Sequence, residues 1–532
     1  MVERLLSIIR QHLALLIALL LAILLKVSVL AIDSVPFNAD EAVVALMARH
    51  ILQGARPVFF YGQSYLGSTD AWLIAAGFTL VGQQVFAIRV VQTLLYVGTL
   101  IITYRLALKI LDRWAAGVAA LLLALPPVLM TLYTTATLGG YGETLLIGAG
   151  LWWWTVRLQE AKRNPIEWLL FGWLAGFGFW TFGLLGVYLV PIGFALLLSR
   201  INSNPWTFRG RWVDYGLALL GFVFGSSPWW LATLAGAATV SELGGSAIAG
   251  ANSNFFSDLA LRVFSLLVLG ISVIIGLRPP WGVGWLALPL APLALVIFFA
   301  SLGWAIKAGR TRPPLYWLLG LIVTLCAVFI LTPFGNDPSG RYFLPVLPPL
   351  AIFAAGLLNQ IRAKYPRIAL GVVGALLAFN LWGNLESALT FPPGLTTQFD
   401  SVTQVNQRDL PRVITFLKAQ GETRGYSNYW VTFPLAFLSH EELLYSAELP
   451  YHPDFRYTPR DNRYAPYIAA VAASERVAYI TTRHPALDQR LRVGFATLGV
   501  TYQEEVIGDF HIFYNLARKV TPVELAVYEV VR

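Results

Sequence analysis

Charge is scarce in this sequence. Aspartate, glutamate, lysine and arginine together make up 13% of the 532 residues, about half the share found in a soluble globular protein. Apolar residues take their place, and the mean hydropathy reaches +0.63. Repeated apolar runs of about 20 residues are each long enough to cross the hydrocarbon core of a bilayer. The composition therefore excludes an ordinary soluble domain and predicts a polytopic membrane protein.

Cysteine is almost absent, since Cys326 is the only one and lies within an apolar run. This excludes a disulfide framework and a cysteine metal site. A cleavable signal peptide is not expected, because the first apolar run (about 13–32) exceeds a signal-peptide core and lacks a small-residue cleavage site. The net charge of +9 does not indicate a nucleic-acid partner, because the basic residues cluster in short loops between apolar runs. That distribution is typical of membrane topology.

Six basic clusters set the predicted topology: Arg4/Arg10, Arg105/Lys109/Arg113, Arg157/Lys162/Arg163, Arg200/Arg209/Arg211, Lys307/Arg310/Arg312 and Arg362/Lys364/Arg367. All six lie in the cytoplasm if an even number of helices separates each neighbouring pair. Eleven apolar runs satisfy this condition, at about 13–32, 84–104, 115–132, 142–156, 167–182, 184–199, 213–233, 285–305, 315–332, 343–358 and 368–386. We therefore expect an all-α membrane domain of about eleven transmembrane helices, with the N-terminus inside and the C-terminus outside.

Two further regions complete the expected organisation. The apolar segment 259–277 would place the fifth basic cluster outside if it crossed the membrane, so we expect an external helix that lies on the membrane. After residue 390 the long apolar runs stop and short helix and strand patterns alternate. The expected domains are thus residues 1–390, with external loops 33–83 and 234–284, and a soluble extracytoplasmic α/β domain, residues 391–532.

The first external loop opens with the stretch PFNADEAVVALMARH, in which Asp40 and Glu41 begin a short predicted helix. Asn38 is a favourable N-cap, and Glu41 three residues later completes the pattern of a capping box. At 100° per residue, Asp40 falls near the centre of an apolar stripe, whereas Glu41, Arg49 and Gln53 lie off it. The stripe consists of Val43, Val44, Met47, His50 and Ile51.

A carboxylate on a buried stripe is costly unless it is paired or used. A functional role for Asp40 is therefore favoured. The alternative is that Asp40 only complements the helix dipole from the first turn.

Other polar residues are expected on the same external face. The first loop continues with Tyr61, Gln63, Tyr65 and Asp70; the second external loop carries Tyr141 and Glu143; and the fifth carries Asp337, Arg341 and Tyr342. Arg341 precedes a membrane helix, where it can bind a phosphate together with the helix N-terminus, or serve only as an interfacial anchor. Glu143 has the alternative of being an ordinary N-terminal helix acid.

Carboxylates and an arginine at the outer interface indicate chemistry on an amphiphile with an anionic headgroup. In this interpretation Asp40 is a general base toward an acceptor hydroxyl, and Arg341 neutralises the phosphate that leaves. A transporter or flippase of lipid-linked sugars would need ionisable residues within several spans, and the spans are almost free of them. A non-catalytic membrane scaffold is the other alternative.

These motifs resemble those of the GT-C glycosyltransferases, in the bacterial branch related to protein O-mannosyltransferases and aminoarabinose transferases. The resemblance covers about residues 10–390 and rests on four motifs in order: Asp40-Glu41, YGQSYLGSTD at 61–70, GGYGE at 139–143 and GRYFLPVLPP at 340–349. It implies a polyprenyl-phosphate sugar donor, a lipid, glycan or protein acceptor, inverting transfer, and an active site on the outer face of the bacterial plasma membrane.

The resemblance also implies roles for individual residues. The family's catalytic carboxylate maps onto Asp40, with Glu41 beside it, and the acid of the second loop onto Glu143. A second acid of the first loop, a divalent-metal ligand in some relatives, is best matched by Asp70. Those relatives take a histidine from a later external loop, but residues 234–284 contain none, which puts a bound metal in doubt.

The C-terminal domain carries an aromatic group, Tyr426, Tyr429, Trp430 and Tyr464. These residues are suited to lining a sugar or lipid groove. They are equally suited to an ordinary core.

Overall fold

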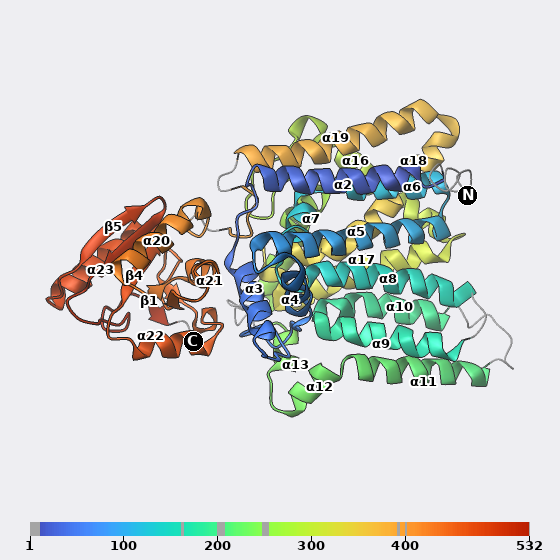
Figure 1. The fold of residues 1–532 in the computed structure, drawn as a ribbon. Coiled ribbons are helices and arrows are strands. Elements are labelled where there is room, and N and C mark those ends of the chain that lie inside the picture. Colours follow the sequence, from blue (N-terminus) through green and yellow to red (C-terminus); the bar gives the residue numbers. More distant parts are fainter. Residues whose placement is uncertain are drawn as a thin grey trace. The chain divides into compact units, whose positions relative to one another are not determined.

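The computed structural model describes residues 11–160, 164–198, 208–246, 255–390, 394–399 and 402–530. The chain forms two compact units (Figure 1). Unit 1 comprises residues 1–32, 63–70 and 89–390, and unit 2 comprises residues 33–62, 71–88 and 391–532. Most of the loop 33–83, expected to belong to the first domain, groups with the C-terminal domain instead. Five of the clustered basic residues lie outside the described residues: Arg4, Arg10, Lys162, Arg163 and Arg200.

Unit 1 is helical, as the apolar runs predict. Its long helices are α2 (Leu13–Ala31), α5 (Val85–Ile110), α8 (Tyr141–Glu160), α9 (Pro165–Thr181), α11 (Phe208–Gly225), α16 (Ala291–Gly309), α17 (Pro313–Leu331), α18 (Leu347–Lys364) and α19 (Pro366–Thr390). Shorter ones are α6 (Arg113–Ala124), α7 (Val128–Tyr133), α10 (Gly186–Leu198), α12 (Ser227–Leu234), α13 (Thr239–Leu243), α14 (Phe255–Phe264) and α15 (Ile271–Ile275). Helices α2, α5, α8, α9 and α11 run nearly parallel (Figure 1).

Each of the eleven expected runs contains a helix, and two of them are broken where proline stands. The run 115–132 divides into α6 and α7 around Pro126 and Pro127, and the run 213–233 bends by 62° between α11 and α12, next to Pro228. Proline causes such breaks because it lacks the backbone donor and clashes with the preceding turn. Within the described residues, seven helices are long and apolar enough to cross a membrane, or eight if the bent pair is one span.

One of these seven is Phe256–Ile275, which overlaps the segment expected to lie on the membrane. It consists of α14, a π-helical segment η3 (Ser265–Gly270) and α15. Its length and composition suit a span as well as a surface helix. Its position on the membrane surface stays a prediction. The even number of membrane helices between neighbouring basic clusters depends on that position and is a prediction too.

Helices α9 and α11 pack closely through two glycine pairs. Gly172 and Gly176 on α9 face α11, and Gly221 and Gly225 on α11 face α9. A methyl group added at Gly176 would lie 2.0 Å from the backbone oxygen of Phe222, and one at Gly225 would lie 2.1 Å from that of Trp173. Each pair is spaced as GxxxG, the pattern that lets helix backbones approach in a membrane.

Replacing Gly176 by alanine should therefore force α9 and α11 apart. We expect Gly176→Ala to lower the free energy of unfolding by about 1–3 kcal/mol, visible as a lower melting temperature in detergent followed by circular dichroism. The matched control is Gly216→Ala on α11, where an added methyl group meets no atom within 4 Å. Equal melting temperatures for the two variants would contradict the close packing.

Unit 2 combines two helices of the first loop with an α/β domain. The loop helices are α3 (Ala39–Leu52) and α4 (Thr69–Val81), the latter beginning in unit 1. The five-stranded sheet has the order β2-β1-β4-β6-β5, formed by β1 (Arg424–Ser427), β2 (Leu444–Ala447), β4 (Ala478–Thr482), β5 (Gln503–Ile507) and β6 (Phe510–Tyr514). Strand β1 pairs in parallel with β2 and β4, while β6 pairs antiparallel with β4 and β5. A small parallel pair joins β3 (Arg456–Tyr457) to β7 (Glu529–Val530).

Two apolar cores lie on opposite faces of this sheet. One contains residues of α20 (Leu410–Gln420) and α21 (Tyr429–Leu438), and the other contains residues of α22 (Ala465–Ala473) and α23 (Pro485–Thr497). Adjacent residues of β4 alternate between them, since Ile480 belongs to the first core and Tyr479 to the second, as the pleat requires. The expected alternation of short helices and strands after residue 390 is confirmed. The helix α21 is not anticipated by the sequence patterns.

Candidate functional site

Asp40 lies in the first turn of α3. The helix begins where predicted, because the side chain of Asn38 accepts a hydrogen bond of 3.1 Å from the backbone N–H of Glu41, as an N-cap does. Asp40 is half-buried, whereas Glu41 is 0% exposed. Of the two adjacent carboxylates, only Asp40 therefore presents surface to a substrate.

The single-stripe interpretation of α3 is only partly correct. The apolar stripe is buried as expected and Gln53 is exposed, but Glu41 and Arg49, placed off the stripe, are buried too. The reason is that α21 packs along α3, with Arg49 Cζ 4.6 Å from the ring centroid of Phe437. Periodicity within one helix gives no sign of a second element covering its other face.

The C-terminal domain contributes the nearest partner of Asp40. The hydroxyl of Tyr429 donates a hydrogen bond of 2.5 Å to Asp40 Oδ1, and the guanidinium of Arg463 lies 5.4 Å from the Tyr429 ring centroid. Asp461 is a second buried carboxyl group here. Burial raises the pKa of Asp461 to about 6; the charge of Asp40 adds to this, while Arg463 and a hydrogen bond from Tyr451 oppose it.

A cluster of ionisable and aromatic side chains occupies the other end of α3. His50 Nδ1 lies 3.0 Å from the Tyr61 hydroxyl and His50 Nε2 lies 3.0 Å from Glu441 Oε1. Tyr467 donates a 2.8 Å hydrogen bond to the same oxygen, and Tyr464 stacks on both His50 and Tyr61. Tyr61, predicted to bind substrate, therefore joins α3 to the C-terminal domain, and Tyr464 belongs to the same contact.

In unit 1, Arg341 begins the 3-10 helix η6 (Arg341–Val346) and forms an ion pair of 2.7 Å with Asp337. Its Nη2 also lies 3.4 Å from the Tyr342 hydroxyl. Within the described residues, the buried Nε of Arg341 donates to no acceptor. Tyr141, buried, is close enough for its hydroxyl to interact electrostatically with Arg341. The predicted grouping of Tyr141, Arg341 and Tyr342 is thus present.

An apolar cavity of about 80 Å³ lies beside this group. Tyr65 and Tyr342 line it together with Phe182, Phe329, Phe334 and leucine and valine side chains. Tyr65, expected near the site, therefore meets Tyr342 across this cavity. Gln63, half-buried, stands two residues before Tyr65 in the same loop. The arrangement connects an apolar cavity to the Arg341 guanidinium through Tyr342, which lines the cavity and lies 3.4 Å from Arg341 Nη2.

Asp70 and Glu143 form a buried pair of carboxyl groups. Gln92 donates a 3.0 Å hydrogen bond to Asp70 Oδ1, and Thr137 donates to Oδ2. Neither oxygen of Glu143 accepts a hydrogen bond from a donor in the described part of the chain, and the group it faces is Asp70. Two carboxyl groups can form a hydrogen bond with each other only if one of them holds a proton. Burial raises the pKa of Asp70, which favours its protonated form.

This pair does not fit a divalent cation. Asp70 already receives hydrogen-bond donors on both of its oxygens. No histidine stands in the pair, and in residues 11–530, apart from the gaps given above, no group of three histidine, cysteine or acidic side chains is placed to hold an ion. We therefore assign no step of the chemistry to a metal at Asp70.

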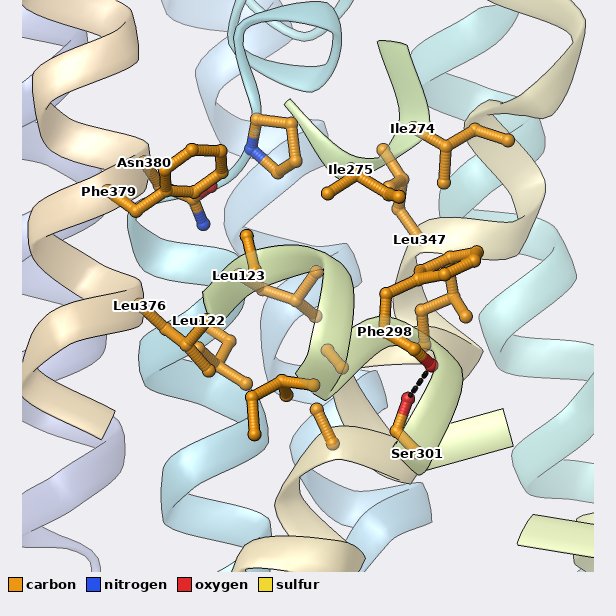
Figure 2. Close-up of a pocket in the computed structure, with 16 residues that line it drawn as sticks. Leu122, Leu123, Ile274, Ile275, Phe298, Ser301, Leu347, Leu376, Phe379 and Asn380 are labelled. Atoms are coloured by element: carbon orange, nitrogen blue, oxygen red, sulfur yellow. Dashed lines mark hydrogen bonds between the residues drawn. The ribbon is translucent and has the colours of Figure 1, made fainter. Parts of the chain in front are cut away.

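A larger apolar cavity of about 100 Å³ lies elsewhere in unit 1, among α6, α15, α16, α18 and α19 (Figure 2). Its two polar side chains are already hydrogen-bonded. Ser301 donates 2.8 Å to the backbone oxygen of Phe298, and Asn380 donates 2.8 Å to that of Leu125. The other lining residues are apolar, so this cavity offers mainly hydrocarbon contact.

The spans are less free of charge than predicted. Lys26, near the C-terminal end of α2, is 3% exposed. Its ammonium group donates to the backbone oxygen and hydroxyl of Thr134 and to the hydroxyl of Thr135. Three acceptors satisfy all three of its donors, so Lys26 is explained as a tie between α2 and the end of α7.

The pKa of Asp461 predicts a pH dependence of stability. Its folded value of about 6 exceeds the ordinary 3.8, so the folded state binds more protons between these values and stability falls as pH rises from 4 to 6. Asp461→Asn removes this effect. We expect the difference in the free energy of unfolding, variant minus wild type, to increase by about 2–3 kcal/mol as the pH rises from 4 to 6. Denaturant unfolding at several pH values measures this difference. If the stability of the two proteins depended on pH in the same way, the raised pKa of Asp461 would be contradicted.

Sequence comparisons agree with the motifs. A family described as dolichyl-phosphate-mannose-protein mannosyltransferase matches residues 69–231. An undecaprenyl phosphate-alpha-4-amino-4-deoxy-L-arabinose arabinosyl transferase of Pseudomonas paraeruginosa is 26% identical over 353 residues, which are 63% of this chain and 58% of that protein. A transferase of the same description from Pseudomonas fluorescens is 27% identical over 60% of this chain and 53% of its own length. The chain thus spans little more than half the length of these relatives.

Solved structures show the fold. ArnT from Cupriavidus metallidurans, solved with undecaprenyl phosphate, superposes with a TM-score of 0.57 at 13% identity, covering 93% of this chain and 98% of that one. The archaeal oligosaccharyltransferase AglB from Archaeoglobus fulgidus gives a TM-score of 0.54 at 14% identity, covering 88% and 69%. Part of the chain is thus similar in sequence to a mannosyltransferase family and to arabinosyl transferases, and the chain shares the fold of ArnT and AglB.

Proposed function

We propose that this protein transfers a sugar from a polyprenyl-phosphate donor to an acceptor hydroxyl at the outer face of the bacterial plasma membrane. The observation that carries the proposal is the apolar cavity beside Arg341, whose buried Nε has no acceptor within the described residues. A polyprenyl phosphate combines the two chemistries that this place offers, since its isoprenoid suits the cavity and its phosphate suits the guanidinium.

Tyr342 connects the two parts of the proposed donor site. Its ring lines the cavity and its hydroxyl lies 3.4 Å from Arg341 Nη2. The ion pair with Asp337 holds the guanidinium in place while leaving Nε unused. An arginine that only anchored the helix at the interface would extend toward water rather than remain half-buried beside an apolar cavity.

The proposed reaction is a single displacement. The acceptor oxygen attacks the anomeric carbon. The bond between the anomeric carbon and the phosphate oxygen breaks, and the polyprenyl phosphate leaves with the electron pair of that bond. Asp40 takes the proton of the acceptor hydroxyl as a general base, and Arg341 stabilises the negative charge that develops on the phosphate. Attack opposite the leaving group inverts the anomeric configuration. The isoprenoid keeps the product in the bilayer.

The base is tested by Asp40→Asn, which keeps the size of the side chain and removes its basicity. Purified wild type should transfer sugar from at least one member of a panel of polyprenyl-phosphate sugars, and Asp40→Asn should be slower by roughly 10²- to 10⁴-fold. Equal rates would move the base to another acid, Glu143 or Asp70 first. Transfer by neither protein with any donor would favour a transporter or a scaffold.

The phosphate contact is tested separately by Arg341→Gln. Loss of a charge-assisted hydrogen bond should weaken inhibition by the product polyprenyl phosphate by roughly 10- to 100-fold, measured as the inhibition constant in the transfer assay. The matched control is Arg408→Gln, which removes an exposed arginine paired with Asp33. If both variants bind the product like wild type, Arg341 is only an anchor.

A further inference from the structure

Helix α21 of the C-terminal domain lies alongside α3 in the same direction. The first residue of α21, Tyr429, meets Asp40, and Phe437 near its end meets Arg49, whose Nη2 donates 3.0 Å to the Phe437 backbone oxygen. The contacts are nine residues apart on α3 and eight on α21, distances of about 13 Å and 12 Å at 1.5 Å per residue. The two helices are therefore in register over more than two turns.

The position of Tyr429 is determined by its own domain. Asn428 caps α21 by accepting from the backbone N–H of Trp430 at 3.0 Å, and its amide donates 2.9 Å to the hydroxyl of Thr482 on β4. The Tyr429 ring packs edge-on against Trp430 and Phe433. A side chain that is 3% exposed and packed in this way has little freedom to change rotamer.

This fixed hydroxyl meets one oxygen of Asp40 only. Tyr429 donates to Oδ1, and among the described residues Oδ2 accepts no hydrogen bond. A carboxylate held through one oxygen has less rotational freedom and leaves the lone pairs of the other oxygen for a further donor. That is the requirement for a general base that must meet an acceptor hydroxyl at hydrogen-bond distance.

We propose that Tyr429 is a positioning residue for glycosyl transfer, and that the C-terminal domain is thereby a working part of the site. The inference rests on the proposed function, because it assigns to Asp40 the role of base. Tyr429 does not touch the substrate in this scheme. It orients the carboxylate that does, and the sheet of the C-terminal domain orients Tyr429.

The far end of the helix pair keeps this register. Glu441, which follows α21, accepts from Tyr467, lies 3.0 Å from His50 Nε2 and forms an ion pair of 3.6 Å with Arg49. Both α3 residues are buried. With α3 tied at both ends, a slip of one helix along the other would break the Tyr429 contact and the Glu441 contacts together.

The test is Tyr429→Phe in the full-length protein, assayed with the donor that wild type uses. We expect kcat to fall about tenfold with the KM for the donor unchanged, since the donor does not meet Tyr429. The acid limb of the kcat–pH profile should move to higher pH, because a carboxylate that loses a hydrogen-bond donor takes up a proton more readily. The other charged groups around Asp40, Asp461 and Arg463, remain in this variant.

The matched control is Tyr445→Phe, which removes a buried hydroxyl that donates 2.9 Å to the backbone of Glu422 in the same domain, away from Asp40. It should lower stability without moving the acid limb. An infrared difference spectrum against Asp40→Asn isolates the carboxylate band of Asp40, and Tyr429→Phe should shift that band.

The outcomes separate the inference from the function on which it rests. An unshifted band, or a shifted band with wild-type kcat and pH profile, overturns the role of Tyr429 while the loss of activity in Asp40→Asn stands. Equal transfer by wild type and Asp40→Asn overturns the proposed base, and the positioning role falls with it. A shifted band, a lower kcat and a displaced acid limb together support the inference.

Discussion

Hydrocarbon offers no hydrogen bonds, so every polar group buried in unit 1 must find its partner within the protein. Burial inside the protein imposes the same requirement, and Arg278, in the expected external loop 234–284, meets it in full. Although 3% exposed, it donates to the backbone oxygens of Leu269, Pro279, Gly282 and Pro338. Lys26 meets the same requirement through Thr134 and Thr135. Charges satisfied in this way hold helices and loops together, and their presence in the helical unit gives no evidence of a transport path.

The same requirement identifies the groups that are available for chemistry. Arg341 keeps a buried Nε without an acceptor, and Glu143 keeps two oxygens without a donor, within the residues that the structure describes. A buried group left in this state costs free energy, so it persists where a ligand or a shared proton removes the cost. For Glu143 the neighbouring Asp70 supplies the explanation. For Arg341 no neighbour does, which is why a phosphate is the stronger interpretation there.

The sequence predicts those features that depend on neighbouring residues. The apolar runs give the helices of unit 1, Asn38 gives the start of α3, and alternating patterns give the strands of the C-terminal domain. The sequence does not reveal features that depend on distant contacts. The glycine pairs of α9 and α11 are visible as two GxxxG patterns, but their pairing requires the fold, and Arg49 looks like a surface residue until α21 is known to cover it.

The candidate site shows the same limit. Asp40 and Glu41 differ by one position, and no local pattern decides which of them meets solvent. Burial decides it, since Glu41 is enclosed and Asp40 is half-buried. The partner of Asp40 is 389 residues away in the chain, beyond any motif that spacing could define. A residue such as Tyr429 is therefore found only by following contacts outward from the carboxylate.

The grouping of the first loop with the C-terminal domain makes Asp40 dependent on that domain. Because α3 and α21 belong to the same unit, a change in the core beneath α21 reaches Asp40 through one packed helix and the Tyr429 hydroxyl. If Asp40 is the base, as proposed, the packing of the C-terminal domain therefore influences the orientation of its carboxylate.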